Sequence, residues 1–592
     1  MSEPGPSATQ HLLVYDRDCA FCCYMVGYAR AITGDRVEYR GYQDVAHEHP
    51  DISEASFRES IHLFSGSSVT RGAEAAARTL AFGGHGALLA CYRHVPGFAS
   101  GAEHAYRLVA RHRRAGARLA RWLFGPALRP AAHQHVARVF TACIGLCALI
   151  AFASFWWQAQ GLVGNDGILP YRPYLDGAQA QLGAAAYVWI PTLAWLGSSD
   201  LVLHLLCGAG VAASLLLTLG RVRASAALTA YLTYLSLVAV GQTFMAYQWD
   251  SLLLECLVVA AVAARAPTWG IWTARLLLLR FMLLSGAVKL LSGDPDWATG
   301  AALEFHFETQ PLPTLLAWYA HQLPRAILHS GAWATLFIEL VLPLCILLPL
   351  RARLLAAAGF VLLELLILLT GNYNFFNLLT IALCTTLLND SKPRAPGSRP
   401  RRLPARLCAA TLMALGSLVT AAGLLRQPLP AALAPLQPLH LVNQYGLFAV
   451  MTRERRELVV EGSLNGSDWR RYRFPFKPGA LQQAPRLAAP YQPRLDWQMW
   501  FAALGKPQDA PWIYDFVQTL LEGRAPVLRL VEAPFEGQAP KYVRILSLRY
   551  RFTSAEERQR SGNWWHADDP RIWLEPMRLR RPVIRHEPLT LE

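Results

Sequence analysis

Long apolar segments are the feature that most constrains the fold of this chain. Between residues 136 and 425 they follow one another with short breaks, and several approach the length of about 20 residues that crosses a bilayer. The chain of 592 residues is 53% hydrophobic but only 16% charged, whereas soluble proteins carry roughly a quarter charged residues. The sequence therefore predicts a polytopic α-helical membrane protein. We expect about nine spans, at 136–158, 200–219, 224–241, 251–264, 271–292, 332–350, 354–370, 373–388 and 405–425.

The basic residues predict which loops face the cytoplasm. The formal charge of +15 comes largely from arginines in short loops, which is the positive-inside pattern and argues against a nucleic-acid partner. The opening MSEPGPSATQ has neither the basic region nor the apolar core of a signal peptide, so we expect a cytoplasmic N-terminus. The basic loops then lie inside: Arg221 and Arg223, Arg265 and Arg275, Arg351 and Arg353, and the run 392–406. Outside we expect the loops 159–199, 242–250, 293–331 and 371–373, with 183–197 re-entrant or interfacial.

The apolar region divides the chain into four expected parts. A small α/β domain occupies 1–115, a basic juxtamembrane linker 116–135, the membrane domain 136–425 and a β-rich soluble domain 426–592. The basic stretch 107–138 fits either a solvated helix face or a helix that lies on anionic lipid. We favour the membrane lipid, because an apolar span follows at once.

A cysteine pair marks the N-terminal domain. The strand-like run HLLVYD ends at Asp16, and Asp18 leads through Cys19 and Cys22 into a helical pattern. A CxxC between a strand and a helix is typical of thioredoxin-like redox domains, because the helix dipole stabilises a thiolate on the first cysteine and the second resolves a mixed disulfide. The alternatives are an incidental pair or half of a metal site. No second Cys/His pair at zinc spacing occurs in this domain, so we expect no metal.

This region also resembles the DCC family of thiol-disulfide oxidoreductase-like proteins, on the motif Tyr15-Asp16-x-Asp18-Cys19-x-x-Cys22, the SIHLF strand, Gly72-Ala73-Glu74-Ala75 and Tyr106-Arg107-Leu108-Val109-Ala110. The resemblance covers nearly the whole domain. It implies that Cys19 is the attacking thiol and Cys22 the resolving one, that Asp16 and Asp18 support the motif, and that the domain has a thiol redox partner. Family members often have glycine at the position of Arg17, and this departure would alter the turn.

Polar residues gather near the helix ends that we expect outside. Lysines near helix ends commonly extend to the interface, but an ionisable residue in a membrane segment, such as Lys289, is also a functional-site hypothesis. For Glu255, Arg280, Glu339 and Glu364, which lie within spans, we favour ion pairs between helices. The candidate membrane-core polar site comprises Gln248, Asp250, Glu255, Asp294, Trp297, His306, Glu308, Asn372 and Asn374.

The chain from residue 240 to residue 575 resembles the lipase maturation factor family. The matching motifs keep their order along the sequence: QWDSLLLE at 248–255, GDPDW at 293–297, HFETQPLP at 306–313, FIE at 337–339, GNYNFFN at 371–377, NxYGLF at 443–448, VVEGS at 459–463, PRLDWQMW at 493–500 and NWW at 563–565. The family's animal members sit in the endoplasmic reticulum membrane and help secreted lipases fold and assemble. The resemblance implies assistance to an exported client and not hydrolysis, and no G-x-S-x-G motif is present.

A shorter resemblance supports an enzymatic alternative. Ser285-Gly286-x-x-Lys289-Leu290, followed by Trp297 and Gly300, is similar to the lysine-bearing membrane helix of vitamin K-dependent carboxylases and their bacterial relatives. That resemblance implies that Lys289 acts as a base toward a reduced quinone, and a quinone is the one cofactor that the sequence suggests. General bases of this kind depend on a tuned, partly desolvated environment.

The C-terminal domain combines strand and helix patterns. The runs 457–461, 469–474 and 542–552 resemble strands, and Asn465-Gly466 is a strong turn signal. Helices are expected after Pro493 and from Trp512. Arg494, Asp496 and Trp497 could contribute to a surface for client proteins, although tryptophans in such a domain more often fill the core or anchor it at the membrane.

These observations favour an integral protein of the bacterial inner membrane, with its N-terminus cytoplasmic and its C-terminal domain periplasmic. The favoured function is folding assistance to exported proteins, with lipases as candidate clients. A quinone-coupled membrane enzyme using Lys289 is the alternative, and a scaffold with a vestigial CxxC is the third option. The predicted topology places the CxxC across the membrane from the C-terminal domain, so electrons would need a carrier.

Overall fold

The computed structural model describes residues 11–125, 132–390, 403–535 and 537–579. The chain divides into two compact units. The first contains the N-terminal residues to His133 with two short segments, Leu348–Arg353 and Asn389–Arg401, and the second contains the rest. Each unit is considered by itself.

The first unit is an α/β domain. Its sheet has the order β2-β1-β3-β4, in which β1 (His11–Tyr15) pairs in parallel with β2 (Glu38–Gly41) and antiparallel with β3 (His62–Ser65). The hairpin partner of β3 is β4 (Ser68–Arg71). The helices that pack around it are α1 (Ala20–Thr33), α4 (Gly72–Phe82), α5 (Ala87–His94), α6 (Phe98–Arg111) and α7 (Arg113–Phe124). The predicted α/β domain is therefore present, and α7 covers much of the expected linker, of which 126–131 lie outside the described residues.

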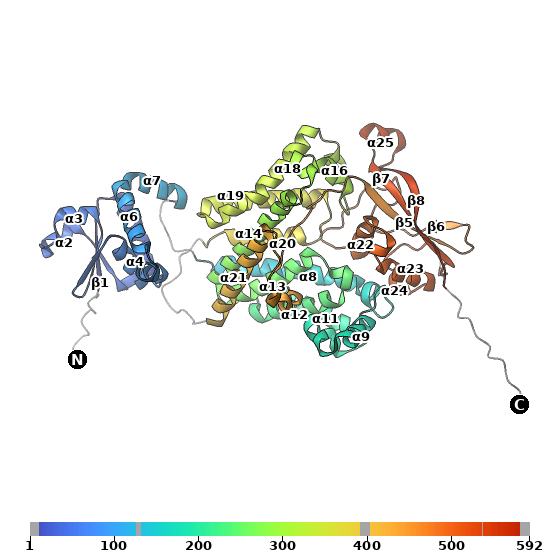
Figure 1. Cartoon of the computed structure of the whole chain (residues 1–592), viewed down its shortest axis with the longest axis horizontal. Coiled ribbons are helices and arrows are strands. Elements are labelled where there is room, and N and C mark those ends of the chain that lie inside the picture. The colour runs from blue at the N-terminus through green and yellow to red at the C-terminus, as the bar shows by residue number, and fades with distance from the viewer. Residues whose placement is uncertain (1–10, 126–131, 391–402, 536, 580–592) are drawn as a thin grey trace, which may run out of the picture. The chain divides into compact units, whose positions relative to one another are not determined.

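The second unit contains the membrane helices (Figure 1). Among the described residues, six helical stretches are long and apolar enough to cross a bilayer: α8 (Gln134–Val163), α11 (Asp200–Thr218), α12 (Arg223–Val240), α18 with its following turn (Arg325–Leu347), α19 (Leu350–Thr370) and α21 (Leu403–Leu424). These helices confirm a helical membrane protein. The remaining three expected spans also contain helices, namely α13 (Gln248–Arg265), α14 (Pro267–Leu291) and α20 (Phe376–Cys384). They are not among the six, so the count of nine spans is not confirmed.

The helices α13 and α14 each carry three charged residues, and most of their side chains are buried. α13 carries Asp250, Glu255 and Arg265, and nearly all of its side chains are buried. α14 begins with Pro267, a residue pre-organised for the first turn of a helix, and it carries Arg275, Arg280 and Lys289. Such charges are tolerated at membrane depth when they face protein rather than lipid. The stretch 183–197 contains only short helical turns.

The C-terminal part of the second unit is a sheet with inserted helices, shown in orange and red in Figure 1. The sheet has the order β6-β5-β7-β8 and is antiparallel, with β5 (Arg455–Ser463), β6 (Trp469–Arg471), β7 (Tyr542–Phe552) and β8 (Trp565–Met577). The helices α22 (Arg494–Ala503), α23 (Trp512–Glu522) and α24 (Ala525–Leu528) lie between β6 and β7 in the chain. The expected strands and helices are thus both present.

One hydrophobic core runs from the membrane helices into this sheet. It includes Phe155 on α8, Trp249 on α13, Trp497 on α22 and Ile545 on β7. A core without an internal boundary indicates that the membrane helices and the C-terminal domain form one packed body.

Candidate functional site

The buried pair of Arg494 and Asp250 joins the C-terminal domain to the membrane helices. Arg494 begins α22 and Asp250 lies in the first turn of α13, and both side chains are fully buried. The guanidinium donates to both carboxylate oxygens, at 3.0 and 2.9 Å. It also donates to the carbonyl of Phe244 at 2.6 Å, and Tyr234 donates to Asp250. A bidentate pair of this kind fixes orientation as well as distance.

The rest of α22 extends this contact. Trp497 packs against Trp249, with ring centroids 4.8 Å apart, and against Tyr247 at 6.0 Å. Asp496 accepts hydrogen bonds from the backbone of Phe476 and Lys477, both at 2.8 Å, and burial raises its pKa to about 6. Arg494, Asp496 and Trp497 therefore have buried side chains. They are therefore not available as an exposed surface for client proteins: Arg494 and Trp497 contact the membrane helices, and Asp496 binds the backbone of the C-terminal domain.

Glu255 and Arg280 form a second buried ion pair, between α13 and α14. The other carboxylate oxygen of Glu255 accepts a hydrogen bond from the hydroxyl of Tyr445 at 2.8 Å and from the backbone of Asn443 at 3.2 Å. The favoured expectation of an ion pair between helices agrees with this arrangement. The ion pair is also bonded to Asn443 and Tyr445, which lie just before the C-terminal sheet, and the sequence did not predict this contact.

Lys289 pairs with Glu339 inside the helix bundle. The ammonium lies 2.7 Å from one carboxylate oxygen and 3.0 Å from the other, and it donates to the carbonyl of Ser285 at 3.0 Å. It also lies 5.2 Å from the ring centroid of Trp297. Gly286 permits this approach, because a Cβ there would come within 2.8 Å of the Cβ of Glu339. Lys289 is thus buried in an ion pair between α14 and α18 rather than extended to the interface.

The GDPDW loop after α14 binds the segment that leads into β5. Asp294 caps the short helix α15 (Pro295–Thr299) by accepting from two backbone N–H groups, and its other oxygen accepts from Met451 at 2.9 Å. Asp296 pairs with Arg453 through two hydrogen bonds of 2.9 and 2.8 Å. Trp297 donates from its indole to the carbonyl of Phe448 at 2.8 Å.

The HFETQ motif, on helix α16 (Ala302–Thr309), contacts the C-terminal sheet. The carboxylate of Glu308 accepts from the backbone of Phe552 at 2.7 Å, and burial raises its pKa. Arg455, fully buried on β5, donates to the carbonyls of Glu308 and Gln310 and to the carboxylate of Glu457. His306 is half-buried nearby, and desolvation and then the charge of Lys289 lower its pKa to about 4.

Gln248 and Asn372 satisfy the backbone of facing loops. Gln248 exchanges two hydrogen bonds with Gly446, at 3.1 and 3.0 Å. Asn372 donates to the carbonyls of Leu312 and Arg486 and accepts from the backbone of Ala488 and Ala489. Asn374 has a positive φ of 51°, and its side chain accepts from the backbone of Phe376. Both asparagines are buried.

These contacts define what we call the buried polar seam, by which we mean the hydrogen bonds and ion pairs made by Gln248, Asp250, Glu255, Asp294, Asp296, Glu308, Asn372, Tyr445, Arg453, Arg455 and Arg494. Most of these side chains are buried, whereas Gln248 and Glu308 are half-buried and Arg453 is exposed. Most of the polar residues singled out from the sequence belong to it, whereas Lys289 and His306 lie beside it. Tyr234, Arg453 and Arg455 were missed. The charged residues that begin the strand RRELVV were the available signal for Arg455.

The CxxC site of the first unit has a different character. Cys19 is the N-cap of α1, and its sulfur accepts a hydrogen bond from the backbone of Cys22 at 3.4 Å. Cys19 is half-buried, Cys22 is buried and Cys23 is exposed. Burial, followed by the hydrogen bond with Cys19, raises the pKa of Cys22 to about 12. The more accessible Cys19 and the shielded Cys22 suit an attacking and a resolving thiol.

Two aspartates shape the turn before this helix. Asp16 accepts from the backbone of Asp18 at 3.1 Å and from the amide of Gln43 at 3.0 Å, and the same amide donates to Asp18 at 3.2 Å. Arg17 donates to Asp44 at 2.8 Å and is not among the described residues with positive φ. The turn therefore does not need the backbone freedom of glycine, so arginine is accommodated there.

Comparisons with known proteins agree with this organisation. Residues 135–395 match the lipase maturation factor transmembrane domain, residues 441–571 the lipase maturation factor C-terminal domain, and residues 13–118 the DCC1-like thiol-disulfide oxidoreductase. The two matches to the lipase maturation factor domains lie on the two sides of the seam.

Curated relatives match most of the chain. Lipase maturation factor 2 of Gallus gallus is 34% identical over 588 residues, covering 75% of this chain and 82% of the relative. Lipase maturation factor 2 of Homo sapiens is 33% identical over 78% of this chain and 82% of its own length. Lipase maturation factor 1 of Bos taurus is 31% identical over 72% of this chain and 86% of its own length. These three relatives come from animals, which gives no support to a bacterial inner membrane, and no solved structure matches the chain.

Proposed function

This chain belongs to the lipase maturation factor family, and we propose that it assists the folding or maturation of exported proteins, lipases among them. The client class comes from the printed names of its relatives. The buried polar seam is the observation that supports the proposal best. It holds a soluble domain rigidly on a membrane bundle, which is the arrangement that a membrane-bound platform for folding clients requires.

We further propose that the chain spans the membrane nine times, with the N-terminus in the cytoplasm and the C-terminal domain on the opposite side. The contacts within the second unit support this order. The C-terminal domain meets the end of α8, the start of α13 and the end of α19, and these helix ends share one side if the nine helices alternate in direction. That side is where exported clients fold.

The N-terminal domain is proposed to exchange thiols with a protein disulfide. The thiolate of Cys19 attacks the partner's disulfide, forms a mixed disulfide and releases one partner thiol. Cys22 then loses its proton and displaces the second partner thiol, so that Cys19 and Cys22 become the disulfide and the partner becomes a dithiol. With the proposed topology this exchange serves a cytoplasmic partner, or a carrier that transfers electrons across the membrane.

Thiol labelling tests the topology. Ser467 is exposed in the turn between β5 and β6, and Ser67 is exposed in the turn between β3 and β4, so each suits a variant with a single cysteine. We expect an impermeant maleimide to label Ser467→Cys in closed vesicles or intact cells, and Ser67→Cys only after permeabilisation. Labelling of both positions before permeabilisation, or of neither until permeabilisation, would contradict the proposed sidedness, and with it the export-side platform.

Client maturation tests the function itself. Cells that lack the chain should yield less active secreted lipase per unit of synthesised lipase, and the wild-type chain should restore it. Lys289→Met combined with Glu339→Gln removes the buried ion pair without leaving one charge alone. A folding assistant with this double substitution should still restore most of the active lipase, whereas an enzyme that uses Lys289 as its base would not. The quinone-coupled alternative is not favoured by the relatives found.

A further inference from the structure

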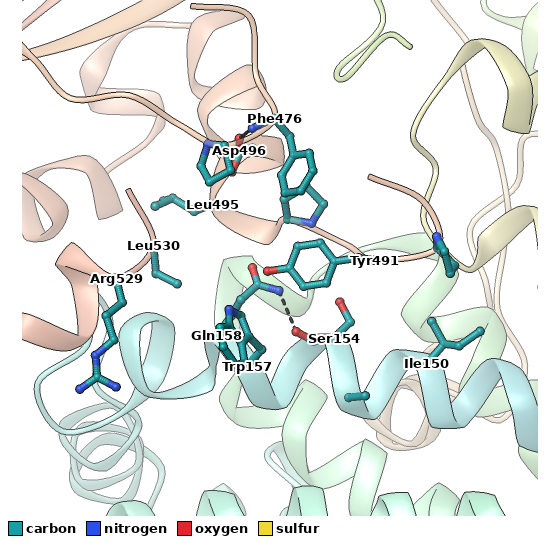
Figure 2. A pocket seen from close by; sticks show the side chains of 14 residues that line it. Ile150, Ser154, Trp157, Gln158, Phe476, Tyr491, Leu495, Asp496, Arg529 and Leu530 are labelled. Carbon is teal, nitrogen blue, oxygen red and sulfur yellow. Dashed lines mark hydrogen bonds between the residues drawn. The ribbon is translucent and has the colours of Figure 1, made fainter. Parts of the chain in front are cut away.

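A groove runs along the last turns of α8, where the C-terminal domain covers this membrane helix. Figure 2 shows Ile150, Ser154, Trp157 and Gln158 of α8 on one wall, and Phe476, Tyr491, Leu495 and Asp496 of the C-terminal domain on the other. The cavity has a volume of about 620 Å³. That volume falls in the range of roughly 300–1,000 Å³ typical of small-ligand sites.

A second cavity of about 570 Å³ continues the groove toward α11 and His204. The two cavities share Ala153, Trp157, Arg529 and Leu530. At this second cavity α8 packs closely against α24. A Cβ at Gly161 would lie only 2.5 Å from the carbonyl oxygen of Pro526. The side chain of Trp157 is 82% exposed although it belongs to a membrane-spanning helix. Exposed tryptophans at the ends of such helices lie at the bilayer interface.

The polar groups of Ser154, Gln158 and Asp496, which line the two walls of the groove, are already hydrogen-bonded. Ser154 accepts from the backbone of Gln492 at 2.9 Å, and Gln158 donates to the carbonyl of Gln492 at 2.7 Å. Gln158 also accepts from the backbone of Arg494 at 2.9 Å. Asp496 accepts the two backbone hydrogen bonds described above. The lining therefore offers mainly apolar surface to an occupant.

Arg529 supplies a cation at the edge where the two cavities meet. It is exposed, and its backbone continues the turn of α24 by donating to Ala525. Within the described part of the chain, its side chain has no hydrogen-bond or ion-pair partner. An unpaired guanidinium beside an apolar groove is complementary to a molecule with an apolar body and one anionic end.

We propose that this groove binds one anionic phospholipid, with an acyl chain along α8 between Ile150 and Leu530 and the phosphate at Arg529. The site is independent of the proposed client function. A polypeptide segment fits the groove less well, because every backbone N–H and C=O of such a segment would need a partner and Ser154, Gln158 and Asp496 are already hydrogen-bonded. The bound phospholipid connects the C-terminal domain to the bilayer at the place where this domain covers α8.

The test uses the full chain purified in mild detergent and exposed to equal amounts of phosphatidylglycerol or phosphatidylcholine, with bound lipid counted by native mass spectrometry. We expect the wild type to retain phosphatidylglycerol in preference to phosphatidylcholine. Arg529→Gln should reduce retention of phosphatidylglycerol about tenfold, as expected for the loss of a charge-assisted contact. Ala153→Phe should reduce retention of both lipids, because Ala153 borders both cavities.

Matched variants separate the groove from the rest of the surface. Arg473→Gln removes another exposed arginine of the C-terminal domain, and Leu146→Phe adds an aromatic ring to an exposed position of α8 outside the groove. Both should retain lipid as the wild type does. The proposal is overturned if Ala153→Phe retains as much lipid as Leu146→Phe, or if Arg529→Gln keeps the preference for phosphatidylglycerol. It is also overturned if an apolar peptide, and not phosphatidylglycerol, protects a cysteine placed at Ala153 from alkylation.

Discussion

The CxxC site and the buried polar seam use polar side chains in opposite ways. At the CxxC, Cys19 is half-buried and its sulfur accepts a hydrogen bond from the backbone of Cys22. In the seam, by contrast, Asp250 receives hydrogen bonds from Arg494 and from Tyr234 and is fully buried. The first arrangement keeps a reactive group available, whereas the second engages both carboxylate oxygens of Asp250 in hydrogen bonds.

This difference assigns separate tasks to the two regions. A buried charge with complete hydrogen bonding contributes orientation and specificity, and its removal is costly because the partner remains buried and unpaired. A half-buried thiol at a helix N-terminus contributes little to packing but is positioned for chemistry. Substitutions in the seam should therefore change stability, whereas substitutions in the CxxC should change thiol exchange.

Arg494→Ala should have the largest effect on stability. It leaves Asp250 in the interior without its cation, and the loss of one partner of a buried pair costs about 3–5 kcal/mol. We expect the C-terminal domain to become sensitive to protease at temperatures where the wild type is resistant. The matched control is Arg560→Ala, because the Arg560–Glu556 pair is 76% and 86% exposed and such helix pairs contribute only about 0.3–0.5 kcal/mol.

Replacing both members of the pair sharpens this prediction. Asp250→Leu combined with Arg494→Met removes the two charges together, so no unpaired charge stays in the interior. The double variant should be more stable than Arg494→Ala. If it is less stable, the hydrogen bonds to Tyr234 and Phe244 contribute more than the pairing of the charges.

Asp294→Ala should have the next largest effect. It removes the cap of α15, which costs about 1 kcal/mol, and leaves the buried N–H of Met451 without an acceptor, which costs a further 1–3 kcal/mol or so. Hydrogen exchange at residues 448–453 should accelerate most. Asp294→Asn keeps one oxygen acceptor and should show a smaller change. Equal exchange in the two variants would mean that the carboxylate charge, and not its hydrogen bonds, is what stabilises this contact.

The sequence predicted the elements of both regions better than their connections. The apolar segments identified the membrane helices, and the strand, CxxC and helix of the first unit follow from local pattern alone. The partners in the seam could not be predicted in the same way, because Asp250 and Arg494 lie 244 positions apart and Asp294 and Met451 lie 157 apart. Local periodicity carries no information about such pairings. The burial of Arg494, which was only a candidate for a client surface, follows from these distant contacts.

Asp496 should make the stability of the C-terminal domain depend on pH. Its pKa is raised by burial to about 6, above the ordinary value of an unfolded aspartate. The folded state therefore binds the proton more tightly than the unfolded state does. The protonated carboxyl of Asp496 therefore stabilises the folded state by about 1–3 kcal/mol below about pH 4, and this stabilisation is lost as the pH rises through 6.

Asp496→Asn provides the measurement for this pH dependence. The asparagine keeps an oxygen that can accept from Phe476 and Lys477 but does not titrate. We expect the difference in unfolding free energy between wild type and variant to change between pH 4 and pH 7, in favour of the variant at the higher pH. A difference that stays constant over this range would show that Asp496 does not titrate there in the folded protein.

Cys19→Ser should have the smallest effect on stability, because it changes the CxxC site and leaves the seam unchanged. Cys19 belongs to the first unit and makes none of the contacts of the seam, so the unfolding midpoint of the second unit should stay the same. Thiol exchange should nevertheless be lost, because Cys22 is buried and its pKa is raised to about 12. Cys22→Ser should instead trap a mixed disulfide on Cys19, visible on a non-reducing gel. If Cys19→Ser destabilised the second unit, the two regions would be coupled, and the division between a reactive site and a structural seam would not hold.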